Sequence, residues 1–179
     1  MQELLARVKA RREDEQGFTL IELMVVVLII AILIAIAIPT FLGAKSRAQD
    51  KSAQSSLRNT LTNAKGIYTD SETYASADAT ALAAAEPSLS FQAGASTGPK
   101  VVSVDSPAAN LFVGAARSSS GKCYAIADNV NGPGTMFMLV ANSGGTCSAA
   151  NANTLDSVSD ETTAGLSAAG TVGEWSGSW

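Results

Sequence analysis

Residues 17–42 read GFTLIELMVVVLIIAILIAIAIPTFL and contain the longest apolar run of the chain. Every side chain from Leu23 to Ile38 is apolar, whereas one carboxylate, Glu22, stands directly before them. As an α-helix with a rise of about 1.5 Å per residue, Leu23–Ile38 is about 24 Å long. The apolar residues on both sides extend it to the ~30 Å of a bilayer core. The stretch therefore predicts a membrane-spanning helix with a carboxylate inside one edge.

Two other interpretations of the apolar run fit its surroundings less well. A fully buried helix would have to be enclosed on every side, which a chain of 179 residues can hardly do. A secretory signal peptide would end in a cleavage site of small residues, and none follows Ile38. Charge favours a cytoplasmic N-terminus only weakly, because basic residues lie on both sides of the run. They are Arg7, Lys9, Arg11 and Arg12 before it, and Lys45, Arg47, Lys51 and Arg58 after it.

The helix is expected to continue beyond Pro39, which removes one backbone hydrogen bond and kinks the chain. Further on, apolar residues recur at spacings of three and four, as on one face of an amphipathic helix. Gly66 and the run Thr69–Ser71 mark its expected end. One helix thus changes its environment midway, from lipid to the core of a domain. The recurring residues are Ala53, Leu57, Leu61, Ala64 and Tyr68.

The hexapeptide from Gly17 to Glu22, with a charged leader before it and the apolar helix after it, resembles the processing signal of type IV prepilins and pseudopilins. The resemblance implies that a membrane aspartyl peptidase cuts between Gly17 and Phe18 and methylates the new amine of Phe18. It also implies that Glu22 pairs with the N-terminal amine of an adjacent subunit in a filament. A carboxylate in lipid costs several kcal/mol, and an opposite charge recovers part of this. The alternative for Glu22 is a tolerated carboxylate at the bilayer edge.

The chain departs from the family pattern in two places. The leader is longer than is usual for prepilins that begin with phenylalanine. The helix before Pro39 has no glycine, so local melting of the helix inside a filament would depend mainly on Pro39. The expected division is a leader at 1–17, a transmembrane and filament-core helix at 18–42, the amphipathic half of the helix at 43–74, and a head at 75–179.

The head is expected to form an antiparallel sheet. A short helix from Ala79 to Glu86 would be capped by Asp78 and stopped before Pro87. Turn residues between Asn129 and Gly134 predict a hairpin. A sheet laid on the apolar stripe of the helix would bury both, which agrees with the α+β pilin fold that the motif implies. The expected strands are Ser88–Gln92, Val101–Val104, Leu111–Ala115, Cys123–Ala127 and Met136–Ala141.

Cys123 and Cys147 are the two cysteines of the chain. A disulfide is expected if this half lies outside the cytoplasm, and two unrelated buried thiols are the alternative. The resemblance favours the bridge, because pilins commonly close their C-terminal region this way whereas many pseudopilins do not.

Composition argues against several other functions. The chain has no histidine, the commonest general base and metal ligand, and no recognisable pair of nucleophile and base. We therefore expect no enzyme, no cofactor and no metal, and the scattered basic residues show no nucleic-acid site. Trp175 and Trp179 are expected to dock on the sheet, with an adhesive surface as the alternative. Three acidic residues suggest either a calcium site or, preferably, a solvated loop: Asp156, Asp160 and Glu161.

The expected function is that of a structural subunit of an extracellular type IV pilus filament. Its expected partners are further copies of itself, the prepilin peptidase and the inner-membrane assembly platform. The precursor would span the cytoplasmic membrane once, with its N-terminus in the cytoplasm, before it enters the filament. A pseudopilin of a secretion or competence system, or a membrane-tethered extracellular binding domain, are the alternatives.

Overall fold

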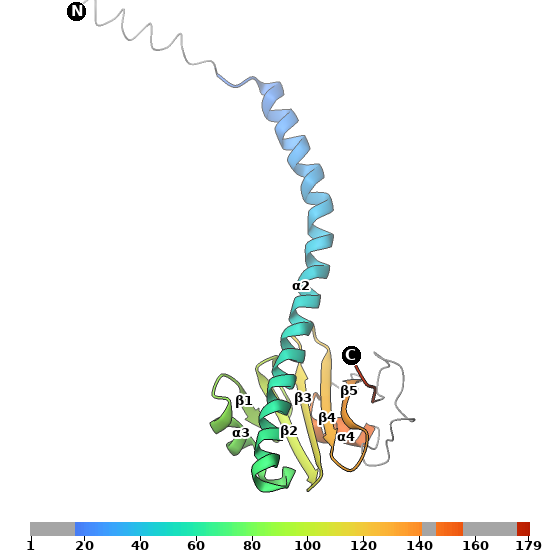
Figure 1. Ribbon diagram of the computed structural model, residues 1–179. Coiled ribbons are helices and arrows are strands. Elements are labelled where there is room, and N and C mark those ends of the chain that lie inside the picture. The colour runs from blue at the N-terminus through green and yellow to red at the C-terminus, as the bar shows by residue number, and fades with distance from the viewer. Residues whose placement is uncertain (1–16, 141–145, 156–174) are drawn as a thin grey trace, which may run out of the picture. The chain divides into compact units, whose positions relative to one another are not determined.

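The computed structural model describes residues 17–140, 146–155 and 175–179 (Figure 1). The chain divides into two compact units, of which the first ends at Ala44 and the second begins at Lys45. Each unit is described by itself.

The longest element is helix α2, Leu20–Ser71, which has 52 residues and contributes to both units. It continues through Pro39, as the sequence predicts. It ends at Ser71, within the predicted run Thr69–Ser71, whereas Gly66 lies inside the helix and does not mark its end. The helix ends where Glu72 adopts a left-handed φ of 56° and its N–H still donates to Tyr68 O at 2.7 Å.

The second unit contains a sheet of five strands in the order β1-β2-β3-β4-β5 (Figure 1). All neighbouring pairs are antiparallel except β1 and β2, which run parallel. The sheet is therefore mostly antiparallel, as expected, with one parallel pair at the β1 edge that was not predicted. Residues 93–100 carry the chain back to the start of β1 before β2 begins, so β1 is not the arm of a hairpin. The strands are β1 Ser90–Gln92, β2 Val101–Ala108, β3 Leu111–Arg117, β4 Cys123–Asn129 and β5 Gly134–Val140.

Three short helices complete the described part of the second unit. The 3-10 helix η1, Tyr74–Ser76, follows α2, and α4, Ala149–Leu155, follows the second cysteine. Helix α3, Ala79–Ala85, begins where the Asp78 carboxylate accepts the N–H of Ala81 at 2.8 Å, which confirms the predicted cap. The α+β arrangement expected from the sequence is therefore present.

The amphipathic half of α2 covers one face of the sheet. Leu57 is fully buried, and it lies over Gly114 of β3, where an added Cβ would be 3.5 Å from a Leu57 methyl group. The small residue at this position lets the helix approach the strand closely. The remaining stripe residues belong to the same core, as the sequence predicts, with Tyr68 partly buried beside it: Ala53, Leu61 and Ala64.

The opposite face of the sheet has a core of its own. Strands β3 and β4 are buried on both sides, because alternate residues face α2 and the second layer. Thus Phe112 belongs to the core under α2, whereas Val113 belongs to the core on the other face. That second core is closed by α4 and by one tryptophan of the C-terminus, in the residues Ala149, Ala152 and Trp175.

Two buried carboxylates, Asp50 and Asp128, also link α2 and the residues that follow it to the rest of the second unit. Asp50, near the start of the second unit, accepts hydrogen bonds from Ser118 at 2.8 Å and from Ser120, and forms an ion pair with Lys122 at 3.0 Å. Burial by itself raises the pKa of Asp50. The hydrogen bonds from Ser120, Lys122 and Ser118 outweigh burial, so the pKa lies below its usual value.

Asp128 of β4 forms the second network. It accepts the hydroxyl proton of Tyr74 at 2.6 Å and of Thr135 at 2.8 Å, and pairs with Lys65 of α2 at 2.7 Å. Burial and the neighbouring Asp128 carboxylate raise the pKa of Tyr74, so this phenol stays protonated as a donor. The two networks hold α2 to the sheet near both ends of its apolar stripe.

The Asp50 network predicts a pH-dependent contribution to stability. Because the pKa of Asp50 is depressed in the folded chain, its charge stabilises the fold above the unfolded-state pKa of about 4, and this contribution is lost as the pH falls below about 4. Asp50→Asn should lower the free energy of unfolding by about 1–2 kcal/mol at pH 7, and by less in strong acid. Urea unfolding of the detergent-solubilised chain, followed by tryptophan fluorescence, measures this. The exposed Asp70→Asn is the control, and a loss for Asp50→Asn that does not vary with pH would contradict the assignment.

Candidate processing and assembly site

The first turn of α2 is closed by reciprocal hydrogen bonds between Thr19 and Glu22. The backbone N–H of Thr19 donates to Glu22 Oε2 at 2.8 Å, and the Thr19 hydroxyl donates to the same oxygen at 2.7 Å. In return, the N–H of Glu22 donates to the Thr19 hydroxyl oxygen at 3.3 Å. This is a capping box, in which the N-cap residue and the residue three positions on satisfy one another's N–H groups.

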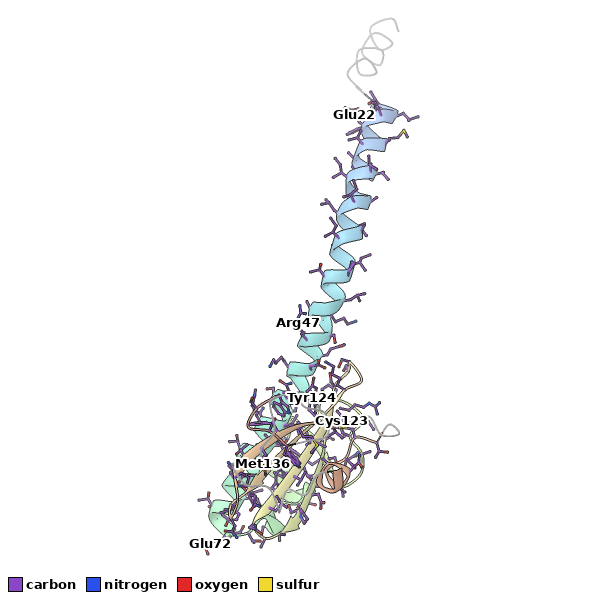
Figure 2. The ribbon with its side chains drawn as sticks, turned by 90° about the vertical axis from the view of Figure 1, so that its right-hand side faces the viewer. Glu22, Arg47, Glu72, Cys123, Tyr124 and Met136 are labelled. Carbon is purple, nitrogen blue, oxygen red and sulfur yellow. A yellow bond between two sulfur atoms is a disulfide. The ribbon has the colours of Figure 1, made fainter. Side chains whose placement is uncertain are left out.

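The capping box fixes where the helix begins. Gly17, Phe18 and Thr19 precede α2 and are exposed, with Phe18 83% accessible. The peptide bond between Gly17 and Phe18 therefore lies outside the helix, where its backbone is not enclosed by a helical turn. Glu22, labelled in Figure 2, stands one turn into the helix.

The role of Thr19 was not predicted from the sequence, although a signal for it exists. A Thr-x-x-Glu sequence immediately before an apolar run is the usual pattern of a capping box. From the sequence, Glu22 was assigned a role only through its charge, as the partner of the N-terminal amine of an adjacent subunit. In the structure its carboxylate accepts hydrogen bonds from Thr19, and the contact between subunits stays a prediction.

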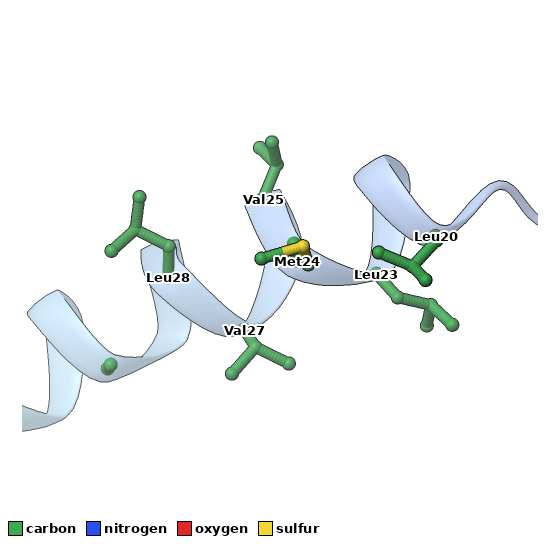
Figure 3. Close-up of a pocket in the computed structure, with 7 residues that line it drawn as sticks. Leu20, Leu23, Met24, Val25, Val27 and Leu28 are labelled. Atoms are coloured by element: carbon green, nitrogen blue, oxygen red, sulfur yellow. The ribbon is translucent and has the colours of Figure 1, made fainter.

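The helix surface that follows Glu22 is apolar and open. Each large apolar side chain between Phe18 and Leu42 is at least 48% exposed. Figure 3 shows Leu20, Leu23, Met24 and Val27 projecting from the helix around a shallow apolar pocket, which residues of this one helix line. By length and composition the helix can cross a membrane. Such a surface binds lipid tails or other apolar helices.

Pro39 lies within this apolar segment. Proline has no N–H to donate, so one carbonyl of the preceding turn loses its helical partner. One turn earlier, Ile36 O accepts the hydroxyl of Thr40 at 3.2 Å. The side chain that follows the proline thus makes a polar contact with the backbone in the same turn in which Pro39 interrupts the helical hydrogen bonds.

Cys123 and Cys147 form a disulfide, with Cα atoms 5.5 Å apart. Cys123 begins β4 next to Tyr124, as Figure 2 shows, and Cys147 precedes α4. Cys147 O also accepts the N–H of Ser96 at 2.7 Å. The bridge therefore attaches the segment that leads into α4 to the sheet.

The other expected site residues differ in outcome. The two C-terminal tryptophans dock on the sheet as predicted, and Trp175 is completely buried. Asp156, Asp160 and Glu161 lie outside the described residues. Within the described ranges, no group of three or more His, Cys, Asp and Glu residues is arranged to hold a metal ion.

Residues 13–38 match the family described as the prokaryotic N-terminal methylation motif. Comparisons with curated proteins and with solved structures gave no significant match. The matched segment contains Gly17, Phe18, Glu22 and most of the apolar helix. It supports a type IV pilin-like protein whose precursor is processed by a prepilin peptidase and whose family members are structural subunits.

The disulfide closes a loop over a sequence separation of 24 and should stabilise the head by about 3 kcal/mol in the chain-entropy model. The double variant Cys123→Ser/Cys147→Ser is therefore expected to unfold at lower urea concentration, with its free energy of unfolding reduced by about this amount. Reductant should lower the stability of the wild-type chain to the same extent and leave the double variant unchanged. Free thiols on the exported wild-type chain, or a wild type that reductant does not affect, would contradict the expectation.

Proposed function

We propose that the chain is a structural subunit of an extracellular type IV pilus filament. A prepilin peptidase cuts it between Gly17 and Phe18, and the new amine of Phe18 is methylated. The observation that carries this proposal is the combination of the processing motif with a long apolar helix surface that stays exposed in the single chain. The role is structural, not catalytic.

The exposed apolar surface of the helix has to be covered first by lipid and then by neighbouring subunits. Before assembly, lipid covers residues 18–42, and the cytoplasmic membrane holds the precursor with its leader at 1–17 in the cytoplasm. In the filament, the same segments of neighbouring copies cover one another as the inner-membrane assembly platform adds subunits. Helix packing then replaces the lipid, with small residues such as Ala31 and Ala35 allowing close approach.

Glu22 gives this packing its register. After cleavage, Phe18 carries a positive amine, which needs an opposite charge once lipid and water are removed. Both hydrogen bonds from Thr19 end on Oε2 of Glu22. The Oε1 atom of the carboxylate therefore accepts a hydrogen bond from the amine of an adjacent subunit, while Oε2 still caps its own helix. The ion pair forms only when two copies meet at the correct offset.

The disulfide in the head supports a location of the head outside the cytoplasm. Disulfides persist in oxidising compartments, and Cys123–Cys147 lies in the part of the chain that follows the membrane segment. Pilins commonly carry such a bridge, whereas many pseudopilins lack it, so the bridge favours a pilus over the pseudopilus of a secretion or competence system.

Removing the charge of Glu22 should block assembly without blocking cleavage. Loss of one member of a buried ion pair costs about 3–5 kcal/mol, enough to lower the equilibrium for subunit addition by orders of magnitude. Glu22→Ala should therefore be cleaved and accumulate in the membrane, and should be nearly missing from sheared filaments. The measurement is an immunoblot of sheared filaments beside one of the membrane fraction.

Two matched variants separate charge from helix capping. Glu22→Gln keeps the shape and the ability to cap Thr19, because glutamine also serves in a capping box. It should fail to assemble as Glu22→Ala does. Glu72→Gln, which removes an exposed carboxylate directly after α2, should assemble normally. Wild-type filament yield from Glu22→Gln would show that Glu22 acts through its cap and not through an ion pair.

A further inference from the structure

Strand β5 lies at one edge of the sheet, and the last residues of the chain occupy its outer side. Phe137 of β5 and Ser176 exchange two backbone hydrogen bonds, each 2.8 Å long. The hydroxyl oxygen of Ser176 lies 3.1 Å from Phe137 O. The C-terminal segment Trp175–Trp179 thus pairs with the edge as a very short antiparallel strand.

Trp175 fills the core on the face of the sheet that carries α4. Its side chain is completely buried and belongs to the cluster of Met136, Met138 and Val140. Met136, labelled in Figure 2, marks this part of the head. A fully buried indole is among the largest apolar contacts a single residue can make.

Trp179 packs on the opposite face. Its ring lies edge-on to Phe137, at 4.6 Å between centroids, and to Tyr124, at 6.0 Å. The guanidinium of Arg58 from α2 lies 4.9 Å from the centre of the same ring. The indole N–H donates to Met138 O at 3.2 Å, so both the apolar and the polar part of Trp179 have partners.

The two tryptophans reach opposite faces because the segment bends around the edge. In a regular strand, residues four positions apart would lie on the same face. Here the hydroxyl of Ser176 donates its proton to Ser178 O at 2.6 Å, where the chain turns between the two rings. The segment therefore contacts both faces of β5. Trp175 packs on one face and Trp179 on the other, and between them the backbone of Ser176 pairs with β5.

We propose that the edge of β5, with the aromatic site on each face, is a peptide-binding site whose resident ligand is the protein's own segment Trp175–Trp179. The ligand class is an extended peptide with tryptophans four residues apart. Main-chain bonds to a strand edge together with pockets for side chains are the physical basis of strand-addition recognition. Filling the site also covers a strand edge that would otherwise be open to pairing with other chains.

The site lies wholly within the second unit of the chain, so the proposal is independent of the proposed filament function. It is tested with a variant of the full chain that lacks Trp175–Trp179. The probe is the synthetic peptide EWSGSW, labelled at its amino end, and the readout is fluorescence anisotropy. The truncated chain should bind the probe saturably. The wild-type chain should bind it only weakly, because its own C-terminus fills the site.

The matched peptide EASGSA should bind the truncated chain about 100-fold more weakly, because buried tryptophans dominate such contacts. Equal binding of the two peptides, or no binding by a truncated chain that circular dichroism shows to be folded, would overturn the proposal. If the truncated chain is unfolded, the same titration is made with Trp175→Ala/Trp179→Ala, which keeps the full length. If that variant is unfolded too, the C-terminus is part of the cooperative core, and the proposal is overturned.

Discussion

The apolar surface of residues 18–42 is the constraint on which the account of this protein depends. Its large side chains remain about half exposed or more, and the hydrophobic effect does not leave such an area in water. Something outside the single chain must therefore cover it. A membrane and a bundle of identical helices both satisfy this requirement. In the proposed filament, the carboxylate of Glu22 would pair with the amine of an adjacent subunit, which a membrane does not offer.

In the second unit the same helix packs against a different partner, the five-stranded sheet. Between Asp50 and Lys65, α2 packs a narrow apolar stripe that includes Leu57 against the sheet. An ion pair lies at each end of this stripe, one made by Asp50 and the other by Lys65. The apolar contacts provide most of the stabilisation, whereas the two buried carboxylates fix how the helix lies along the strands. The disulfide and Trp175 close the far face of the sheet, which α2 does not reach.

The sequence predicted the features that depend on local periodicity. The long helix, the stripe around Leu57, the cap at Asp78 and the hairpin between β4 and β5 all follow from spacing and turn residues. The parallel pairing of β1 was not predictable in this way, because it depends on where residues 93–100 carry the chain.

Features that depend on distant partners were also missed. Asp50 looks like any solvated residue of an amphipathic helix until Ser118, 68 positions away, is placed beside it. The two-sided burial of β3 and β4 did leave a signal, since both strands are almost continuously apolar instead of alternating. At the candidate site, the motif and Glu22 were found from sequence, whereas the role of Thr19 in holding Glu22 needed the hydrogen bonds themselves.

The intact mass of the chain in purified sheared filaments tests the central claim most directly. The account predicts that this chain forms the bulk of the filament, lacks residues 1–17, begins at Phe18 with one added methyl group, and keeps the bond between Cys123 and Cys147. A chain that is missing from the filaments or present only in traces, or one that enters them with the leader still attached, would contradict it.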